Sequence, residues 1–321
     1  INLFTLAGGP AFAVDGTINS VNIGKGANSV SGNTVLGESA LDASVSGANN
    51  TAVGFESLTA NTSGANNTAV GRRAGKAITT GSSNTVVGTN SLFACTTGTQ
   101  NTALGQSCMF AITTGSDNVA IGKGALNTAT TADNNLAIGV DALNANTSGT
   151  QNVAVGNFSL DAATTADNNV AIGHNSLTAN TTGLANSALG SKSMQSNTTG
   201  QQNTALGQEA LRDNTTANFN TAVGKSALQN NSTGEQNTAV GASALTANTS
   251  ANSNTAVGSS SLTANTTGAG NNAIGKQSLL VCTTGSLNNA LGVDALKAVS
   301  TGNNNIGIGH DAGRSASPSG N

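Results

Sequence analysis

The sequence contains few of the side chains that fill an ordinary globular core. It has no Trp and no Tyr among its 321 residues, aromatic residues make up 2% of the chain, and only 8% of residues are charged. A chain this poor in large apolar groups cannot fill a wide core, so a folded core must be thin and repeated many times. Proline occurs only at Pro10 and Pro318. Disordered chains usually carry more proline and more charge, and the apolar residues here are strictly periodic, which disorder does not require.

Charge of either sign is also scarce. The formal net charge is -3, so the chain lacks the basic surface that binds nucleic acid or anionic lipid. No stretch approaches the roughly 18 consecutive apolar residues that a membrane-spanning helix needs. We therefore expect no nucleic-acid partner and no membrane insertion.

The residues that most often bind metals or catalyse reactions are few and scattered. Cys95, Cys108 and Cys282 are odd in number and lack CxxC spacing, which favours buried free thiols over a metal site or a disulfide framework. His174 and His310 are too far apart in the repeat to share a site within one chain, although three copies of His174 around a trimer axis are a minor alternative. We predict no enzyme activity, no cofactor and no metal; a catalytic domain beyond the ends of the chain stays an open alternative.

A 17-residue period runs through the chain. Glycine recurs every 17 residues from Gly37 to Gly309, and an Asn stands four residues before each of them. The repeat reads Asn-Thr-Ala-Val-Gly, two variable residues, Ala/Ser-Leu, two more residues, Asn-Thr-Thr-Gly and a two-residue spacer, without interruption over residues 33–313. We number its positions as columns 1 to 17, starting at the Asn. In residues 50–66 the defining positions are Asn50, Gly54, Leu58, Asn61 and Gly64.

This period predicts an all-β fold. Common helical repeats need about 30 to 47 residues, whereas each unit here has a short β-type run at Thr-Ala-Val, a glycine corner, a second short run at Ala-Leu and a Thr-Thr-Gly turn. That is one coil of a parallel β-solenoid, with coils stacked in register about 4.8 Å apart. We expect an apolar lead-in and first partial coil over residues 1–32, the solenoid over 33–313 and a tail over 314–321.

The lead-in contains Ala11-Phe12-Ala13, which looks like a signal-peptide cleavage site. It has neither a basic stretch nor an initiator Met before it. Two interpretations stay open for residues 1–13: the remnant of a signal peptide, or an apolar segment that docks or assembles.

The columns indicate which side chains are buried. Column 4 is always aliphatic and column 9 is nearly always Leu or Met, so we expect these two columns to form the core. Columns 3 and 8 hold mostly Ala or Ser, and such small residues suggest close approach of a second or third copy of the chain. Column 12 exchanges Asn for Ile or Cys, which predicts an enclosed stack of Asn amides bonded from coil to coil.

Columns 6 and 7 vary freely and should face solvent. They form the candidate recognition ridge, on which we single out Arg72, Arg73, His174 and Lys225. Columns 13 and 14 are almost always Thr or Ser, whose hydroxyls are expected to close a turn and stack between coils. An ice-binding array needs alternate threonines on one face, and adjacent ones point to opposite sides. An ice-binding solenoid is therefore only a remote alternative.

The repeat resembles one found in tail fibres of bacteriophages. It is also similar to a lengthened head repeat of trimeric autotransporter adhesins, whose Asn-Ser-Val-Ala-Ile-Gly motifs wind a left-handed β-roll in homotrimers. Residues 118–122 and 169–173, both Asn-Val-Ala-Ile-Gly, come nearest to that motif. The resemblance covers about residues 15–313, although the coil is longer than the adhesin unit and no coiled-coil stalk or membrane anchor is visible.

The resemblance implies a homotrimer, an extracellular or virion location, and contact with a glycan or protein of a host cell surface. The sequence thus favours a structural fibre shaft with an adhesive role, namely a bacteriophage tail fibre. A bacterial extracellular adhesin or filament subunit on the cell surface is the alternative.

Overall fold

The computed structural model describes residues 16–18 and 20–314. The questions about a signal-peptide remnant at residues 1–13 and about the tail beyond Arg314 lie outside the described residues. The chain divides into two compact units, Ile1–Asn134 and Asn135–Asn321. We call them the N-terminal and C-terminal units and describe each by itself.

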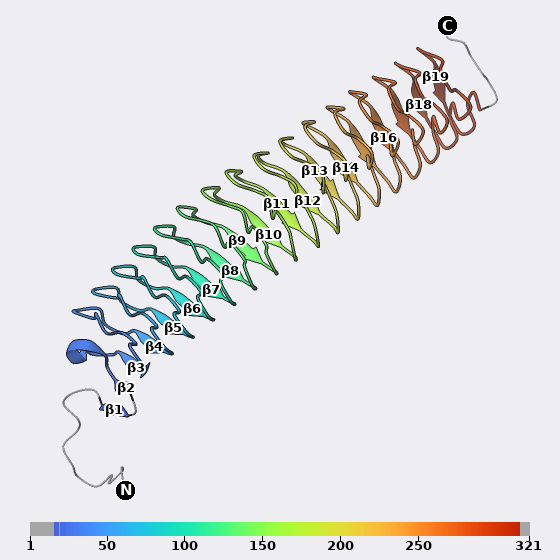
Figure 1. Cartoon of the computed structure of the whole chain (residues 1–321). Helices are drawn as coiled ribbons and strands as arrows, with labels where there is room; N and C mark the ends of the chain where they lie inside the picture. Colours follow the sequence, from blue (N-terminus) through green and yellow to red (C-terminus); the bar gives the residue numbers. More distant parts are fainter. Residues whose placement is uncertain (1–15, 19, 315–321) are drawn as a thin grey trace. The chain divides into compact units, whose positions relative to one another are not determined.

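The N-terminal unit begins with two short antiparallel strands and continues as a parallel stack (Figure 1). Strand β2 pairs antiparallel with both β1 and β3, whereas β3 and the strands after it pair in parallel. The elements of this unit are β1 (Gly16–Ile18), β2 (Val21–Gly24), a 3₁₀ turn η1 (Ala27–Ser29), β3 (Thr34–Gly37), β4 (Thr51–Val53), β5 (Thr68–Val70), β6 (Thr85–Val87), β7 (Thr102–Leu104) and β8 (Val119–Ile121).

The C-terminal unit is a stack of parallel strands, one on each coil (Figure 1). Pairing is in register at the period of the repeat, so that Val153 of one coil lies between Leu136 and Val170 of its neighbours. This confirms the predicted parallel β-solenoid. Its strands are β9 (Leu136–Ile138), β10 (Val153–Val155), β11 (Val170–Ile172), β12 (Ser187–Leu189), β13 (Thr204–Leu206), β14 (Thr221–Val223), β15 (Thr238–Val240), β16 (Thr255–Val257), β17 (Asn272–Ile274), β18 (Asn289–Leu291) and β19 (Ile306–Ile308).

The core differs from the expected one in column 4. Within each strand from β4 to β19 the middle residue points inward, so Ala52 is fully buried while Val53 is half-exposed. The prediction that column 4 belongs to the core is wrong, and column 3 takes its place beside column 9, where Leu58 is fully buried. Side chains alternate between the two faces of a strand, and the inward position is Ala in most coils and Val at the buried Val35 and Val86.

The columns of small residues also have a different explanation from the expected one. Ala52 and Ser57 are fully buried within their own chain. Their small size is therefore set by the narrow interior of the coil, and they are not exposed to a neighbouring copy.

The expected second β-run around column 9 is a tight turn. Glu56 and Leu58 have φ angles of 53° and 48°, a left-handed conformation that costs a non-glycine residue about 1–2 kcal/mol. The turn directs the Leu58 side chain inward, and burial of such a side chain is worth about 1.5–3 kcal/mol. The Leu58 N–H still donates to the Ala74 carbonyl of the next coil at 3.1 Å.

Contacts between coils keep the residues of columns 5 and 15 small. Gly54 has a φ of 125°, and a Cβ there would lie 2.6 Å from the carbonyl oxygen of Gly71 in the next coil. A Cβ on Gly64 would collide with the carbonyl oxygen of Gly81. Because the obstacle is a backbone atom, column 5 is Gly in every coil, whereas column 15 accepts Ala in four coils, at Ala132, Ala166, Ala217 and Ala251.

Two Asn columns bind the coils to one another. In column 1, the N–H of Asn50 donates to Asn33 Oδ1 at 2.8 Å, and Asn50 Nδ2 donates to the Gly64 carbonyl at 2.9 Å. In column 12, Asn231 Nδ2 donates to Asn214 Oδ1 at 3.1 Å. These contacts confirm the predicted stack of buried amides.

The column 12 stack stops wherever an apolar residue replaces Asn. The Oδ1 atoms of Asn61 and Asn265 are buried and have no hydrogen-bond partner. The coils that follow them carry Ile78 and Cys282, which supply no amide donor. Each unpaired oxygen therefore marks the end of a run of amides.

Candidate interaction surfaces

Columns 2 and 4 form the outer face of the parallel strands, a continuous uncharged surface of each unit. In β15 the side chains of Thr238 and Val240 point outward and Ala239 points inward. Exposed fractions in column 4 are 46% at Leu189 and 48% at Leu291, and 71% at Ile308 in β19. From β3 to β19, no column 2 or column 4 position carries a charge. The sequence prediction missed this surface because it assigned column 4 to the core.

The threonines of column 2 differ from those of column 13. Column 13 hydroxyls are engaged between coils, as where Thr62 Oγ1 donates to the Thr79 carbonyl at 3.1 Å, and this confirms their expected structural role. The column 2 hydroxyls of the described strands, including those of Thr221 and Thr238, make no hydrogen bond to the protein. They are therefore available to water or to another molecule.

Column 2 changes character within the C-terminal unit. On β9, β10 and β11 it holds aliphatic residues instead of Thr, so both outward columns are apolar there. We call these six half-exposed side chains the aliphatic block. The aliphatic block consists of Leu136, Ile138, Val153, Val155, Val170 and Ile172.

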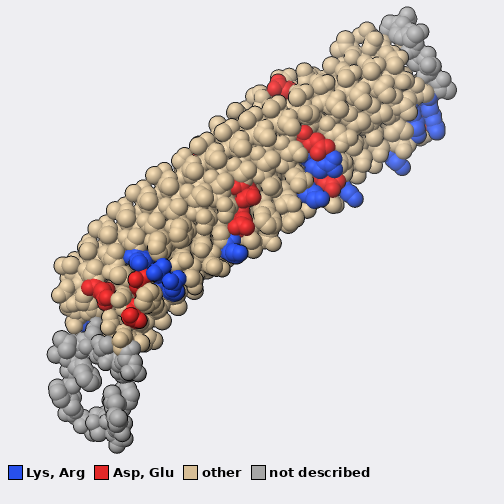
Figure 2. All heavy atoms as spheres, viewed as in Figure 1, with Lys and Arg blue, Asp and Glu red and all other residues tan. Residues whose placement is uncertain are grey.

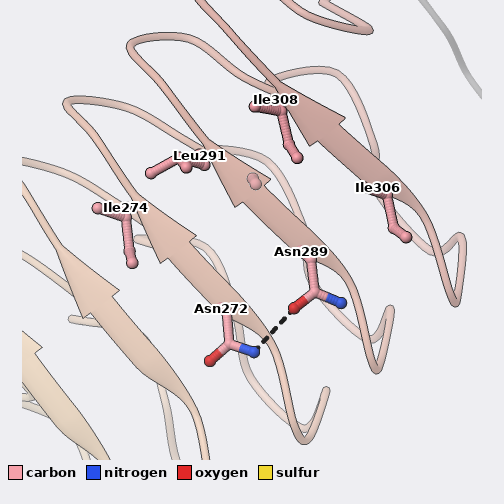
Figure 3. Close-up of a pocket in the computed structure, with 7 residues that line it drawn as sticks. Asn272, Ile274, Asn289, Leu291, Ile306 and Ile308 are labelled. Carbon is pink, nitrogen blue, oxygen red and sulfur yellow. Dashed lines mark hydrogen bonds between the residues drawn. The ribbon is translucent and has the colours of Figure 1, made fainter.

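A shallow hollow lies on the same outer face over β17, β18 and β19 (Figure 3). Its volume is about 230 Å³, and its lining is aliphatic except for Asn272 and Asn289, whose side-chain amides bond to each other at 2.9 Å. Ile306 and Ile308 of β19 are 73% and 71% exposed, the most exposed large apolar side chains in the described part of the chain. The hollow offers apolar contact and one amide pair, and no titratable group lines it.

The recognition ridge is solvent-facing, as expected. Arg72, His174 and Lys225 are exposed and Arg73 is half-buried. The structure brings only Arg72 and Arg73 together, on one coil of the N-terminal unit. His174 and Lys225 belong to the C-terminal unit and stand three coils apart, which is about 14 Å at the strand spacing of a sheet.

Column 10 also belongs to this ridge, which the sequence analysis did not anticipate. Glu56 Oε2 accepts from Arg73 Nε at 2.7 Å and from Lys76 Nζ, in column 10 of the next coil, at 2.8 Å. The hydrogen bonds from Lys76 and Arg73 lower the pKa of the Glu56 carboxyl. Phe93 and Phe110, two further column 10 residues, stack with ring centroids 5.0 Å apart.

Acidic and basic side chains lie in mixed clusters on the visible surface (Figure 2). In the C-terminal unit, Arg212 contacts both Asp213 and Glu209, and Lys297 contacts Asp294. Because cations and carboxylates pair within each cluster, the ridge has no strong net charge. Exposed pairs of this kind add little to stability, about 0–1 kcal/mol each.

No arrangement among the described residues is suited to binding a metal ion. Groups of three or more His, Cys, Asp or Glu side chains that could hold one are absent from residues 16–18 and 20–314. Asp141 and Asp161 are neighbours, and burial followed by the charge of Asp141 raises the pKa of the Asp161 carboxyl. Among the described residues, one histidine contacts a carboxylate: His310 Nδ1 lies 3.1 Å from Asp311 Oδ2.

The three cysteines are buried free thiols, as the sequence predicted. Burial raises the pKa of each thiol to about 11. Thiols that are protonated and shielded from solvent are poor nucleophiles. They act as small apolar groups in columns 8 and 12.

The fold and its surfaces define the chain as a β-solenoid repeat protein. No protein-family model, curated protein or solved structure matches it. Among the described residues, no helix is long and apolar enough to cross a membrane.

Proposed function

We propose that this chain is a structural fibre shaft that assembles as a homotrimer, and that it serves as a bacteriophage tail fibre contacting the surface of a host cell. The observation that carries the proposal is the outer strand face. It is uncharged in every described coil and leaves a column of aliphatic side chains partly exposed. A fibre of this kind would lie outside the host cell, as part of a virion.

The physical argument is the cost of leaving that face in water. Each Å² of apolar surface removed from water contributes about 25 cal/mol, and soluble monomers rarely expose a continuous apolar patch of more than a few hundred Å². A second and third copy can cover the face, because identical chains present the same rows in the same order. Closed symmetric association of this kind is the usual form of homo-oligomers.

The recognition ridge supports an adhesive role for the assembly. Its side chains occupy columns other than those of the strand face, so they stay in solvent when copies associate through columns 2 and 4. A host glycan or protein could then contact residues such as Arg72 and Lys225, which are exposed.

The first test is the mass of the purified chain by light scattering at low and high concentration. We expect a value near three chains of 31.1 kDa at both. The variant Val223→Asp/Val240→Asp places carboxylates on the strand face and should give single chains. Lys225→Asp changes the charge of the ridge and should leave the mass unchanged. A single-chain mass for the natural sequence contradicts the trimer.

A bacterial surface adhesin or filament subunit is the alternative within the same class of assembly. Binding of the labelled trimer to cells separates the two: a phage fibre should bind a narrow range of bacterial strains, and an adhesin should bind surfaces foreign to the bacterium that makes it. Ridge variants such as Arg72→Ala/Arg73→Ala should weaken binding without changing the mass.

One observation favours a second function if the chain is a monomer. The column 2 hydroxyls face outward beside column 4 aliphatics on a regular strand array, and those of the described strands make no hydrogen bond to the protein. Rows of this kind can order water at about 4.8 Å intervals, which is the property an ice-binding surface needs. Thermal hysteresis that is present in the natural chain and lost in the variant Thr221→Lys/Thr238→Lys would support ice binding. A natural chain without thermal hysteresis would exclude it.

A further inference from the structure

We propose that the aliphatic block on β9, β10 and β11 fixes the register in which copies of this chain associate. The inference rests on the proposed self-association through the strand face. It assigns a separate role to six residues, which is to make one alignment of the copies better than the alignments displaced by whole coils.

A uniform repeat leaves register poorly defined. Displacing one copy by 17 residues places Gly on Gly and Asn on Asn in almost every coil, and column 4 changes only among Val, Leu and Ile. Register is weakly specified wherever the paired surfaces look alike after a shift. Column 4 therefore supplies attraction between copies but hardly any preference for one alignment.

Column 2 is the outward column whose residues change in a non-repeating order. In the C-terminal unit it is aliphatic on β9 to β11, Ser187 on β12, Thr on β13 to β16, Asn on β17 and β18, and Ile306 on β19. A displacement of one coil places the row of Val170 against the row of Ser187. Each further coil of displacement brings another aliphatic row against a hydroxyl row. Because column 2 is also aliphatic at Val119 on β8, aliphatic rows cease to meet one another only at four coils.

The aliphatic block is too small to hold a partner by itself, and a second copy of the chain is the partner that matches both the block and the face around it. Stable interfaces bury about 800 Å² on each partner, and three rows of two side chains are far smaller than that. The block can act only as part of the longer strand face, which the same columns continue on β12 to β16. A copy aligned in register presents an identical block at the same row.

The Asn pair on β17 and β18 adds a second mark of register. Asn272 Nδ2 donates to Asn289 Oδ1 on the outer face, so these two rows prefer a partner with matching amides. In a displaced pair they would face the Thr rows or the exposed side chains of Ile306 and Ile308. The aliphatic block and the Asn pair therefore both favour the alignment in which equivalent coils of the copies lie side by side.

The test compares register in two variants by disulfide crosslinking. One chain carries the reporter cysteine Thr204→Cys and the other carries Thr221→Cys, two column 2 positions that lie one coil apart. The two chains have tags of different length, so that each crosslinked product can be identified. The natural thiols are buried and should not crosslink. In the natural background, crosslinks should join cysteines at the same position and 204-to-221 crosslinks should stay at background. The variant Leu136→Thr/Val153→Thr/Val170→Thr should raise the 204-to-221 crosslinks on the order of tenfold.

A matched control removes three methyl groups elsewhere in column 2. Thr238→Ser/Thr255→Ser combined with Thr102→Ser should leave crosslinking in register. Thr already occupies column 2 in most coils, so the variant Leu136→Thr/Val153→Thr/Val170→Thr should fold, which far-UV circular dichroism can check. The single variant Val153→Thr repeats the crosslinking measurement with only one row of the aliphatic block changed.

The outcomes separate the two proposals. If the natural chain is monomeric by light scattering, the proposed trimer is wrong and the register inference falls with it. If the natural chain and the block variant are both trimers with crosslinks only at matching positions, the register inference is overturned and the trimer stands.

Discussion

At the scale of single residues, the Asn side chains show how a chain with few large apolar groups holds its coils together. Asn231 both donates to Asn214 Oδ1 and accepts from Asn248 Nδ2, at 3.1 Å and 2.7 Å. All three are fully buried. A buried amide with its partners in place contributes modestly, whereas a buried group left without a partner costs about 1–3 kcal/mol. The stack is therefore most sensitive in its middle.

Replacing Asn231 with Ala should test this. The substitution leaves Asn214 Oδ1 without its donor and Asn248 Nδ2 without one of its two acceptors, so we expect a loss of about 1–3 kcal/mol in the free energy of unfolding. Urea unfolding followed by circular dichroism measures it. Asn230→Ala is the matched control, because that neighbouring Asn is exposed and its side chain makes no hydrogen bond. Equal losses in the two variants would contradict the role of the stack.

The buried thiols predict how stability depends on pH. Burial raises the pKa of the Cys95 and Cys108 thiols from 9.0 to about 11. Between those values the unfolded chain has lost protons that the folded chain keeps, so stability should fall as pH rises from about 9 towards 11, by up to roughly 3 kcal/mol per thiol. Below pH 9 these thiols should contribute no pH dependence.

The measurement is the free energy of unfolding at pH 8 and pH 10.5 under reducing conditions. The comparison variant, Cys95→Ile/Cys108→Ala/Cys282→Ile, takes each substitution from residues that already occur in the same column. It should lose less stability between the two pH values than the natural chain. Equal losses would show that other groups cause the alkaline effect.

At the scale of one strand, the orientation of the Thr-Ala-Val run decides what the protein can do. The repeat length, the parallel sheet, the solvent-facing ridge, the burial of column 12 and the role of column 13 could all be predicted from the sequence. The orientation could not, because a three-residue strand with Ala in the middle and Val at one end has too short a pattern to show its buried face. Hydropathy favours Val inside, yet the buried middle position is Ala in all but three coils, which carry Val35, Val86 and Gly307.

The candidate interaction surface was missed for the same reason. With column 4 assigned to the core, nothing drew attention to column 2 beside it. The signal that could have found the surface is the run Leu136, Val153 and Val170, which departs from Thr in consecutive coils. Column 3 is Ala in all but three coils, whereas column 2 ranges from Ser to Leu, and that wider range indicates an outward position.

Two substitutions in β15 test the orientation directly. Ala239→Leu adds volume to a fully buried position and should cost about 1–3 kcal/mol or more in unfolding free energy. Val240→Leu makes a change that column 4 already contains, as at Leu189 and Leu206, and should leave stability nearly unchanged. Thermal unfolding of the two variants distinguishes them, and the reverse order would restore column 4 to the core.

At the scale of the whole molecule, each unit is a stack in which a coil contacts its immediate neighbours. Column 1 illustrates this: Asn237 accepts from the N–H of Asn254, and its own N–H donates to Asn220, each one coil away. In repeat proteins of this type stability is close to a sum of coil and interface contributions. The length of a unit is then adjustable, provided that the columns stay aligned.

Removing one whole coil should therefore be tolerated. Deletion of residues 237–253 joins Gln236 to Asn254, which restores every column and lets β14 pair with β16 in the register that β15 had. The C-terminal unit loses one of eleven strands, so we expect far-UV circular dichroism and protease resistance close to those of the natural chain and a modest loss of unfolding free energy. Deletion of residues 237–245 removes fewer residues but shifts all later columns by nine positions, placing side chains where glycine is required and outward residues inside. That shorter deletion should unfold the coils beyond it, and equal tolerance of the two deletions would show that the columns do not determine the fold.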